Sequence, residues 1–179
     1  MGPGIDPDHP AAMTLKHAFV SCWNMSEYEN ASLWQVYGRG IAIRSTFARL
    51  RESLICTDPV YIGVVNYIDY RRDSFPEGNA FTPLLHKRLY FENERELRAV
   101  IPGQTMTEVK DPDGEVIDWS WTGDPRVGVA ATVDLDKLIA GIYVAPGETL
   151  LFEAVEAICR RYELGLTPQQ SSLDELPRF

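Results

Sequence analysis

Residues 60–70 read Val-Tyr-Ile-Gly-Val-Val-Asn-Tyr-Ile-Asp-Tyr, and this is the most strand-like stretch of the chain. Its β-branched and aromatic residues are typical of strands, and it becomes polar only near its end. The pattern therefore predicts a core strand over residues 60–67, around which the remaining elements should pack.

The segments on both sides of this stretch predict an irregular mixture of helices and strands. Apolar residues at helical spacing predict the helices, and short runs of β-branched residues predict the strands. Helices are expected over residues 29–37, 47–55, 82–90 and 148–164, with a short helical turn over 134–138. Further strands are expected over residues 18–23, 40–44, 94–101, 128–134 and 139–145.

This order predicts the α+β class, because strands and helices do not alternate regularly as in a wound parallel sheet. We expect a single domain over residues 18–166, with a mixed or mostly antiparallel central sheet and about four helices packed on it. The apolar face of the helix over 148–164 should cover that sheet. Residues 1–17 are expected to be a disordered leader and residues 167–179 a loose tail, and residues 103–126 should be the least ordered part of the domain.

The composition excludes several classes of partner. The 179 residues carry a formal net charge of −9, which argues against a nucleic-acid backbone or an anionic membrane surface. No apolar run is long enough to span a membrane. The three cysteines lack the close spacing of a disulfide framework, and the start of the chain lacks the features of a signal peptide, so we expect a reduced, cytoplasmic protein. The three histidines are not grouped with one another or with cysteine, and no metal site is predicted.

The charged run over residues 92–98 is the strongest candidate site. If residues 94–101 form a strand, Glu94, Glu96 and Arg98 share one face because side chains alternate. The two carboxylates could then accept ribose hydroxyls or act as a base, while Arg98 binds an anionic group. The alternative is a helix on which these charges form a solvated surface.

Two pairs of neighbouring residues extend this candidate site. Trp34 and Tyr37 lie three residues apart in a predicted helix, where they either anchor the helix in the core or form a stacking wall beside the carboxylates. Lys87 and Arg88 precede the acidic run, where they either bind phosphate or form a solvated helix end.

Four segments of the chain resemble the bacterial domain-of-unknown-function 2971 family. That family has the motifs Ser-Cys-(Phe/Trp), Glu-Ser-x-x-Met-Trp-x-x-Tyr, Lys-Arg-x-x-Phe-Glu-x-Glu-x-Glu-x-Arg and a late Leu-Ile-x-x-Ile-x-Val-x-Pro. Asn30 and Leu33 stand where the second motif has Ser and Met. Members carry a further segment before the first motif, so the resemblance implies an N-terminally shortened member; the family has no established activity. The matching segments are residues 19–23, 29–37, 87–98 and 133–146.

Two functions remain open. The first is a nucleotide-processing enzyme that is loosely similar to ADP-ribosyltransferases, with Glu94 or Glu96 as the catalytic carboxylate and Trp34 or Tyr37 stacked on nicotinamide. NAD is the cofactor to test in that case. The second is a non-catalytic sensor or protein-interaction module of a stress or phage-defence system. The similarity is one of fold alone and does not decide between them.

Overall fold

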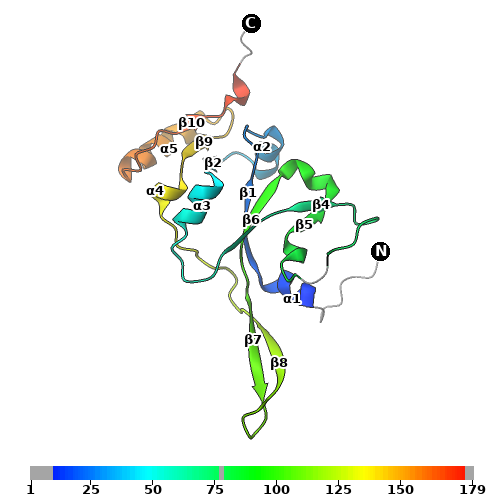
Figure 1. Cartoon of the computed structure of the whole chain (residues 1–179). Helices are drawn as coiled ribbons and strands as arrows, with labels where there is room; N and C mark the ends of the chain where they lie inside the picture. The colour runs from blue at the N-terminus through cyan, green and yellow to red at the C-terminus, as the bar shows by residue number, and fades with distance from the viewer. Residues whose placement is uncertain (1–9, 77–78, 176–179) are drawn as a thin grey trace. The chain divides into compact units, whose positions relative to one another are not determined.

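A computed structural model describes residues 10–76 and 79–175 of the chain (Figure 1). Helices and strands are mixed along the chain, as predicted. The predicted central sheet is not found among the described residues. In its place these residues form four small sheets of two or three strands each.

The chain divides into two compact units, and each is described by itself. Unit 1 comprises Met1–Met25 and Asp58–Ala130, and unit 2 comprises Ser26–Thr57 and Ala131–Phe179. Each unit is therefore built from two separate stretches of sequence. This division does not confirm the predicted single domain over residues 18–166.

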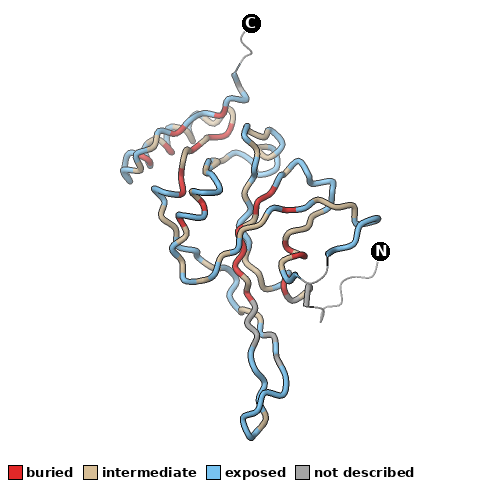
Figure 2. The backbone as a smooth tube through the Cα atoms, viewed as in Figure 1, coloured by how far each residue is buried: buried red, intermediate tan, exposed pale blue. Residues whose placement is uncertain are grey.

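The main sheet of unit 1 has three antiparallel strands in the order β1 (Phe19–Asn24), β6 (Glu96–Ile101) and β3 (Tyr61–Val64). The central strand β6 is buried along most of its length, which Figure 2 shows in red. Val100, paired with β1 on one side and β3 on the other, is only 1% exposed. The core of unit 1 is therefore centred on β6.

The predicted strand over residues 60–67 is present but interrupted. It consists of β3 and β4 (Asn66–Ile68), which are separated by Val65. Val65 is 3% exposed, and its backbone N–H donates to the Glu96 carbonyl oxygen at 2.9 Å. The interruption lets β4 leave the main sheet and form a parallel pair with β5 (His86–Arg88).

The predicted helix over residues 82–90 is wrong. This segment contains a 3-10 turn, η1 (Thr82–Leu84), then the strand β5, and then a second 3-10 turn, η2 (Leu89–Glu94). The backbone of β5 forms its hydrogen bonds with β4. The turn that begins at Thr82 and Pro83 therefore does not continue as a helix. Pro suits the first turn of a helix, but it does not specify how far the helix continues.

The prediction of little order over residues 103–126 is also wrong. The strands β7 (Gln104–Lys110) and β8 (Val116–Gly123) form an antiparallel hairpin that extends away from the main sheet of unit 1 (Figure 1). At its turn, Asp111 Oδ1 accepts hydrogen bonds from two following backbone N–H groups at 2.9 and 3.0 Å. Gly114 has a φ of 89°, which favours glycine.

A short helix, α1 (Pro10–His17), lies inside the segment predicted to be a disordered leader. Residues 1–9 of that segment lie outside the described residues. The helix ends against the base of the hairpin, where a Cβ atom added to Gly103 or Gly123 would overlap His17. The absence of a side chain at these two positions therefore makes room for the end of α1.

Unit 2 contains a second three-stranded sheet, in which β9 (Gly141–Val144) is the central strand. It pairs antiparallel with β2 (Ile41–Arg44) and parallel with β10 (Gln169–Gln170). The tail predicted to be loose therefore contributes a strand, and a 3-10 turn, η3 (Ser172–Asp174), follows it. Residues 176–179 lie outside the described residues. The predicted strand over residues 128–134 is wrong, because this segment makes only an isolated bridge at Val133.

Four α-helices of unit 2 agree with the predicted helices, and three of them have a side-chain N-cap, which satisfies free N–H groups. They are α2 (Ala31–Tyr37), capped by Asn30; α3 (Phe47–Ser53), capped by Thr46; α4 (Leu135–Leu138), capped by Asp134; and α5 (Thr149–Arg161).

The apolar face predicted for α5 is only partly buried. Val155 and Cys159 are 7% and 5% exposed, and Phe152 is half-buried. Ile158 is 50% exposed, although its helical position predicted burial. The part of α5 that is buried is therefore narrower than the apolar face that its sequence predicted.

We expect Gly103→Ala to destabilise the chain because the new Cβ would overlap the backbone carbonyl group of His17. The cost should be about 1–3 kcal/mol, the usual range for overpacking. Urea unfolding of the variant and the parent measures it. Gly128→Ala is the matched control, since a Cβ at Gly128 would meet nothing within 4 Å. Equal losses in the two variants would contradict the packing of α1 on the hairpin.

Candidate functional site

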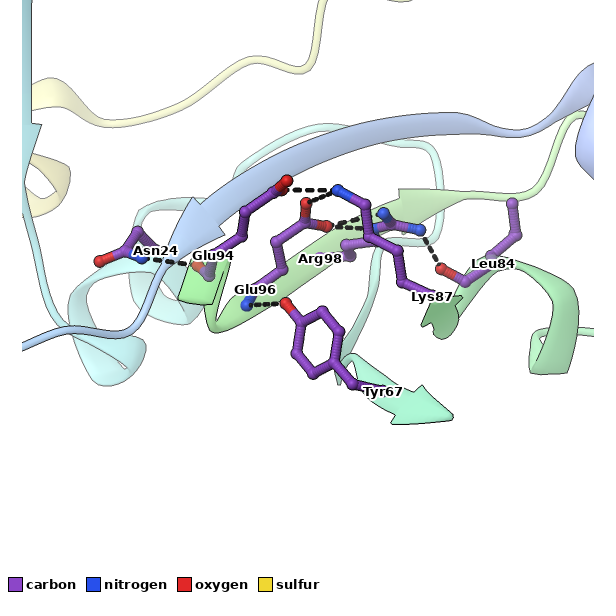
Figure 3. Close-up of polar contacts among 7 residues, drawn as sticks. All are labelled: Asn24, Tyr67, Leu84, Lys87, Glu94, Glu96 and Arg98. Atoms are coloured by element: carbon purple, nitrogen blue, oxygen red, sulfur yellow. Dashed lines mark hydrogen bonds and ion pairs between the residues drawn. The ribbon is translucent and has the colours of Figure 1, made fainter. Parts of the chain in front are cut away.

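Four charged side chains of unit 1 meet beside β6 and are called the charged cluster below (Figure 3). Lys87 Nζ lies 2.5 Å from Glu94 Oε2 and 2.8 Å from Glu96 Oε1. Arg98 donates from Nε and Nη2 to Glu96 Oε2, each at 2.7 Å. Glu96 therefore binds both cations of the cluster, one with each carboxylate oxygen.

Three local elements place these side chains. Glu96 and Arg98 are two residues apart in β6, so they share a face as predicted. Lys87 is the middle residue of β5. Glu94 is not on the strand as predicted, because it ends the 3-10 turn η2. Arg95 follows with a φ of 42°, and this left-handed residue turns the chain from η2 into β6.

The members of the charged cluster differ in depth. The Glu96 side chain is 7% exposed, whereas those of Arg98, Glu94 and Lys87 are 16%, 18% and 24% exposed. Glu96 therefore lies at the bottom of the cluster. The other three side chains form a partly open rim.

The electrostatics of the cluster favour its charged forms. Burial alone would raise the pKa of Glu96, but hydrogen bonds from Lys87 and Arg98 and the charge of Arg98 lower it to about 2. Burial would also lower the pKa of Lys87, yet its hydrogen bonds to the two carboxylates raise it. Burial would lower the pKa of Arg98 as well, but its hydrogen bond with Glu96 and the charge of Glu96 raise it. Nearby opposite charges and hydrogen bonds outweigh desolvation here.

Neighbouring groups that the sequence did not reveal hold the cluster in place (Figure 3). The Glu96 backbone N–H donates to the Tyr67 hydroxyl oxygen at 2.8 Å, and Asn24 Nδ2 donates to the Glu94 carbonyl oxygen at 2.5 Å. Arg98 Nη1 donates to the Leu84 carbonyl oxygen. The only sequence signal for Tyr67 was its place in a strand, which does not specify its partner.

Cys22 lies beside Arg98 in the register of β1 and β6, and it is exposed. Although the residue as a whole is exposed, partial burial of its thiol, and then the charge of Glu96, raises the pKa of the thiol, and Arg98 opposes this effect. The thiol therefore stays protonated at neutral pH and is a poor nucleophile. On the other side of Arg98 the register places Gly63, which contributes no side chain to the cluster.

Arg88 does not join Lys87 in the charged cluster, although the sequence offered both as phosphate ligands, with a solvated helix end as the alternative. Neighbouring residues of a strand point to opposite faces, and β5 therefore separates them. The guanidinium carbon of Arg88 lies 4.7 Å from the centre of the Tyr70 ring. Lys87 Nζ lies 4.7 Å from the centre of the Phe91 ring.

Trp34 and Tyr37 belong to helix α2 of unit 2 and are described with that unit. Tyr37 is 74% exposed, so it does not anchor the helix. Trp34 is half-buried, and its Nε1 donates to Glu29 Oε2 at 3.1 Å. Neither residue is a member of the charged cluster.

Within residues 10–76 and 79–175, His, Cys, Asp and Glu side chains form no group of three or more that could hold a metal ion. None of the helices in these ranges has the length and apolar character needed to cross a bilayer. Comparison of the chain with family models, with curated proteins and with solved structures found no match.

We expect acid to destabilise the fold through Glu96. Its pKa is lowered to about 2 from an ordinary 4.5, so ionised Glu96 stabilises the folded state at neutral pH. This stabilisation, on the order of 3 kcal/mol, should be lost as the pH falls from about 5 to about 2. Urea unfolding over a pH series measures the slope. Glu96→Gln should remove this part of the slope, whereas retention of the full slope in that variant would contradict the assignment.

At neutral pH, Glu96→Gln should itself lower the free energy of unfolding. The amide keeps the shape of the side chain, but it leaves Lys87 and Arg98 without their deepest counter-charge. Breaking such a buried pair costs about 3 kcal/mol. Glu92→Gln, at an exposed position in η2, is the control and should change stability by less than about 0.5 kcal/mol. Similar values for both variants would show that the ion pairs contribute little.

Proposed function

We propose that the charged cluster binds the ribose-phosphate part of a nucleotide, and that unit 1 is a nucleotide-binding domain with NAD as the ligand to test. The observation that carries this proposal is the rim formed by Lys87, Glu94 and Arg98. It presents a carboxylate and two cations that are 16–24% exposed, above a Glu96 that is nearly buried.

The rim residues match the two kinds of group in a ribose phosphate. A carboxylate such as Glu94 accepts hydrogen bonds from ribose hydroxyls. Arg98 and Lys87 can neutralise phosphate oxygens, and a guanidinium can do so with two parallel hydrogen bonds. Glu96 contributes by holding both cations in place, at 2.7 and 2.8 Å. This assignment makes Glu96 a positioning residue rather than a first contact of the ligand.

The low pKa of Glu96 limits the catalytic roles that this residue can have in such a site. With a pKa of about 2, Glu96 is too weak a base to remove a proton efficiently at neutral pH. An ionised carboxylate can still stabilise the positive charge that develops on a ribose when nicotinamide leaves it. An ADP-ribosyltransferase-like activity would therefore use the rim carboxylate Glu94 as the fixed negative charge beside the ribose, while Glu96 positions the two cations.

Membership of the domain-of-unknown-function 2971 family is part of this proposal. It rests on the motifs over residues 19–23, 29–37, 87–98 and 133–146. All four members of the charged cluster fall in the third motif, namely Lys87, Glu94, Glu96 and Arg98. The family implies no particular reaction, so the ligand chemistry above comes from the cluster itself.

A second function is a non-catalytic sensor or protein-interaction module, and the hairpin of unit 1 favours it. Val109, Val116 and Ile117 near the hairpin turn are 38%, 45% and 64% exposed. Exposed apolar side chains on these two paired strands are available to a protein partner. This alternative predicts that nucleotides leave the stability of the protein unchanged.

A melting experiment with NAD, ADP-ribose and nicotinamide separates these functions. A ligand that binds only the folded state should add about 2.7 kcal/mol at about 100 times its Kd. NAD and ADP-ribose should stabilise the protein, whereas nicotinamide, which lacks ribose and phosphate, should not. No stabilisation by either nucleotide would overturn the proposal and favour the interaction module.

Glu94→Gln tests the site in the same experiment. The variant removes a rim carboxylate but leaves Glu96 paired with both cations, so its unliganded stability should fall by less than about 1 kcal/mol. Its Kd for ADP-ribose should rise about tenfold, because a charge-assisted hydrogen bond is lost. Glu92→Gln is the matched control and should bind as the parent does. Equal affinity in all three proteins would place the ligand elsewhere.

A further inference from the structure

Unit 2 contains a small, mostly apolar cavity that is open to solvent over much of its extent. Its volume is about 290 Å³, close to the lower end of ligand pockets. The space suits a ligand of one or two rings. The cavity is lined by residues of α2 and the loop after it, by residues that follow β9 and by one residue of η3, and the lining includes Ala31, Trp34, Gly38, Arg39 and Leu173.

The aromatic wall of this cavity is fixed in orientation. Trp34 Nε1 donates to Glu29 Oε2 at 3.1 Å, which restrains rotation of the indole ring. Asn30 caps the helix that carries Trp34, because its side chain accepts hydrogen bonds from the N–H groups of the first turn. A restrained indole ring with an accessible face is a good platform for stacking.

The same carboxylate also holds the segment that contributes a second part of the lining. Glu29 Oε2 accepts a hydrogen bond from Ser171 Oγ at 2.6 Å. Glu29 Oε1 accepts from the backbone N–H of Ser172 at 2.8 Å and from its Oγ at 3.0 Å. Leu173, the next residue, lines the cavity. Glu29 therefore joins the two parts of the lining, although 142 residues separate it from Ser171.

The cavity also has a cation at its edge. Arg39 lines it, and the Arg39 side chain is 85% exposed. Its Nε lies 3.2 Å from Glu148 Oε1, so the exposed guanidinium can still offer its Nη atoms to an anion. An apolar cavity with one restrained aromatic ring and one exposed guanidinium matches a flat apolar ligand with a single negative charge.

We propose that this cavity binds a small planar aromatic carboxylate, with the ring against Trp34 and the carboxylate near Arg39. Glu29 is the positioning residue, because it holds both Trp34 and the Ser171–Ser172 backbone that carries Leu173. The proposal does not depend on nucleotide binding by unit 1. No residue of the charged cluster lines this cavity.

Titration with benzoate, followed by NMR of the backbone amides and indole N–H groups, tests the site in the full chain. Loss of one indole signal in Trp34→Phe identifies the Trp34 resonance. Benzoate should shift this signal and the amides of Ala31 and Gly38 together, in a saturable way with a Kd in the millimolar range. Cyclohexanecarboxylate has the same charge but no aromatic ring, and its Kd should be about threefold higher or more.

Two variants assign the roles of the side chains. Arg39→Gln changes an exposed residue, so the fold should persist while the Kd for benzoate rises about two- to fivefold. Benzyl alcohol, which is aromatic but uncharged, should bind the parent and Arg39→Gln equally. Glu29→Gln should move the Trp34 indole signal even without ligand, and it should weaken benzoate binding.

The proposal is overturned by any of three results. These are non-saturable or scattered shifts with benzoate, equal affinity for cyclohexanecarboxylate, and an unchanged benzoate affinity in Arg39→Gln. If Glu29→Gln fails to fold, Ser172→Ala is the substitute. It removes the side-chain hydrogen bond to Glu29 Oε1 and should shift the benzoate affinity in the same direction.

Discussion

Glu96 places a negative charge on the most buried strand of unit 1, and the surrounding structure must compensate for it. A carboxylate that is 7% exposed is costly unless opposite charges and hydrogen bonds surround it. Lys87 lies on β5, which pairs in parallel with β4, and Arg98 lies on β6 itself. The ion pairs therefore connect the main sheet with the segment between residues 82 and 94, which consists of two 3-10 turns and the short strand β5.

Several local features are explained by this requirement. The left-handed Arg95 lets η2 end where Glu94 reaches Lys87. Gly63 lies opposite Arg98, and a Cβ there would lie 2.7 Å from Leu85 Cδ1. The absence of a side chain at Gly63 makes room for the side chain of Leu85. The carbonyl oxygen of the preceding residue, Leu84, accepts a hydrogen bond from Arg98. In unit 2, Glu29 has a related role, since one carboxylate holds two segments that are distant in the sequence.

The sequence predicted those parts of the fold that depend on local pattern. Alternation placed Glu96 and Arg98 on one face, and the helical spacing of apolar residues located α2 and α3. Long-range pairing was not predictable in this way. The segment over 82–90 forms β5 because β4 lies beside it as a pairing partner. Side chains alternate between the two faces of β5, and this alternation separates Arg88 from Lys87. The division into two units depends on contacts between stretches that are separated in the sequence, and no local signal marks them.

The most direct test is the titration of the Glu96 carboxyl carbon, followed by ¹³C NMR with site-specific assignment from Glu96→Gln. The account predicts that this carbon titrates with a pKa of about 2, because Lys87 and Arg98 hold the carboxylate in its charged form. A pKa near 4.5, the ordinary value of an exposed glutamate, would contradict the buried ion pairs on which the structure of unit 1 and the proposed nucleotide site both depend.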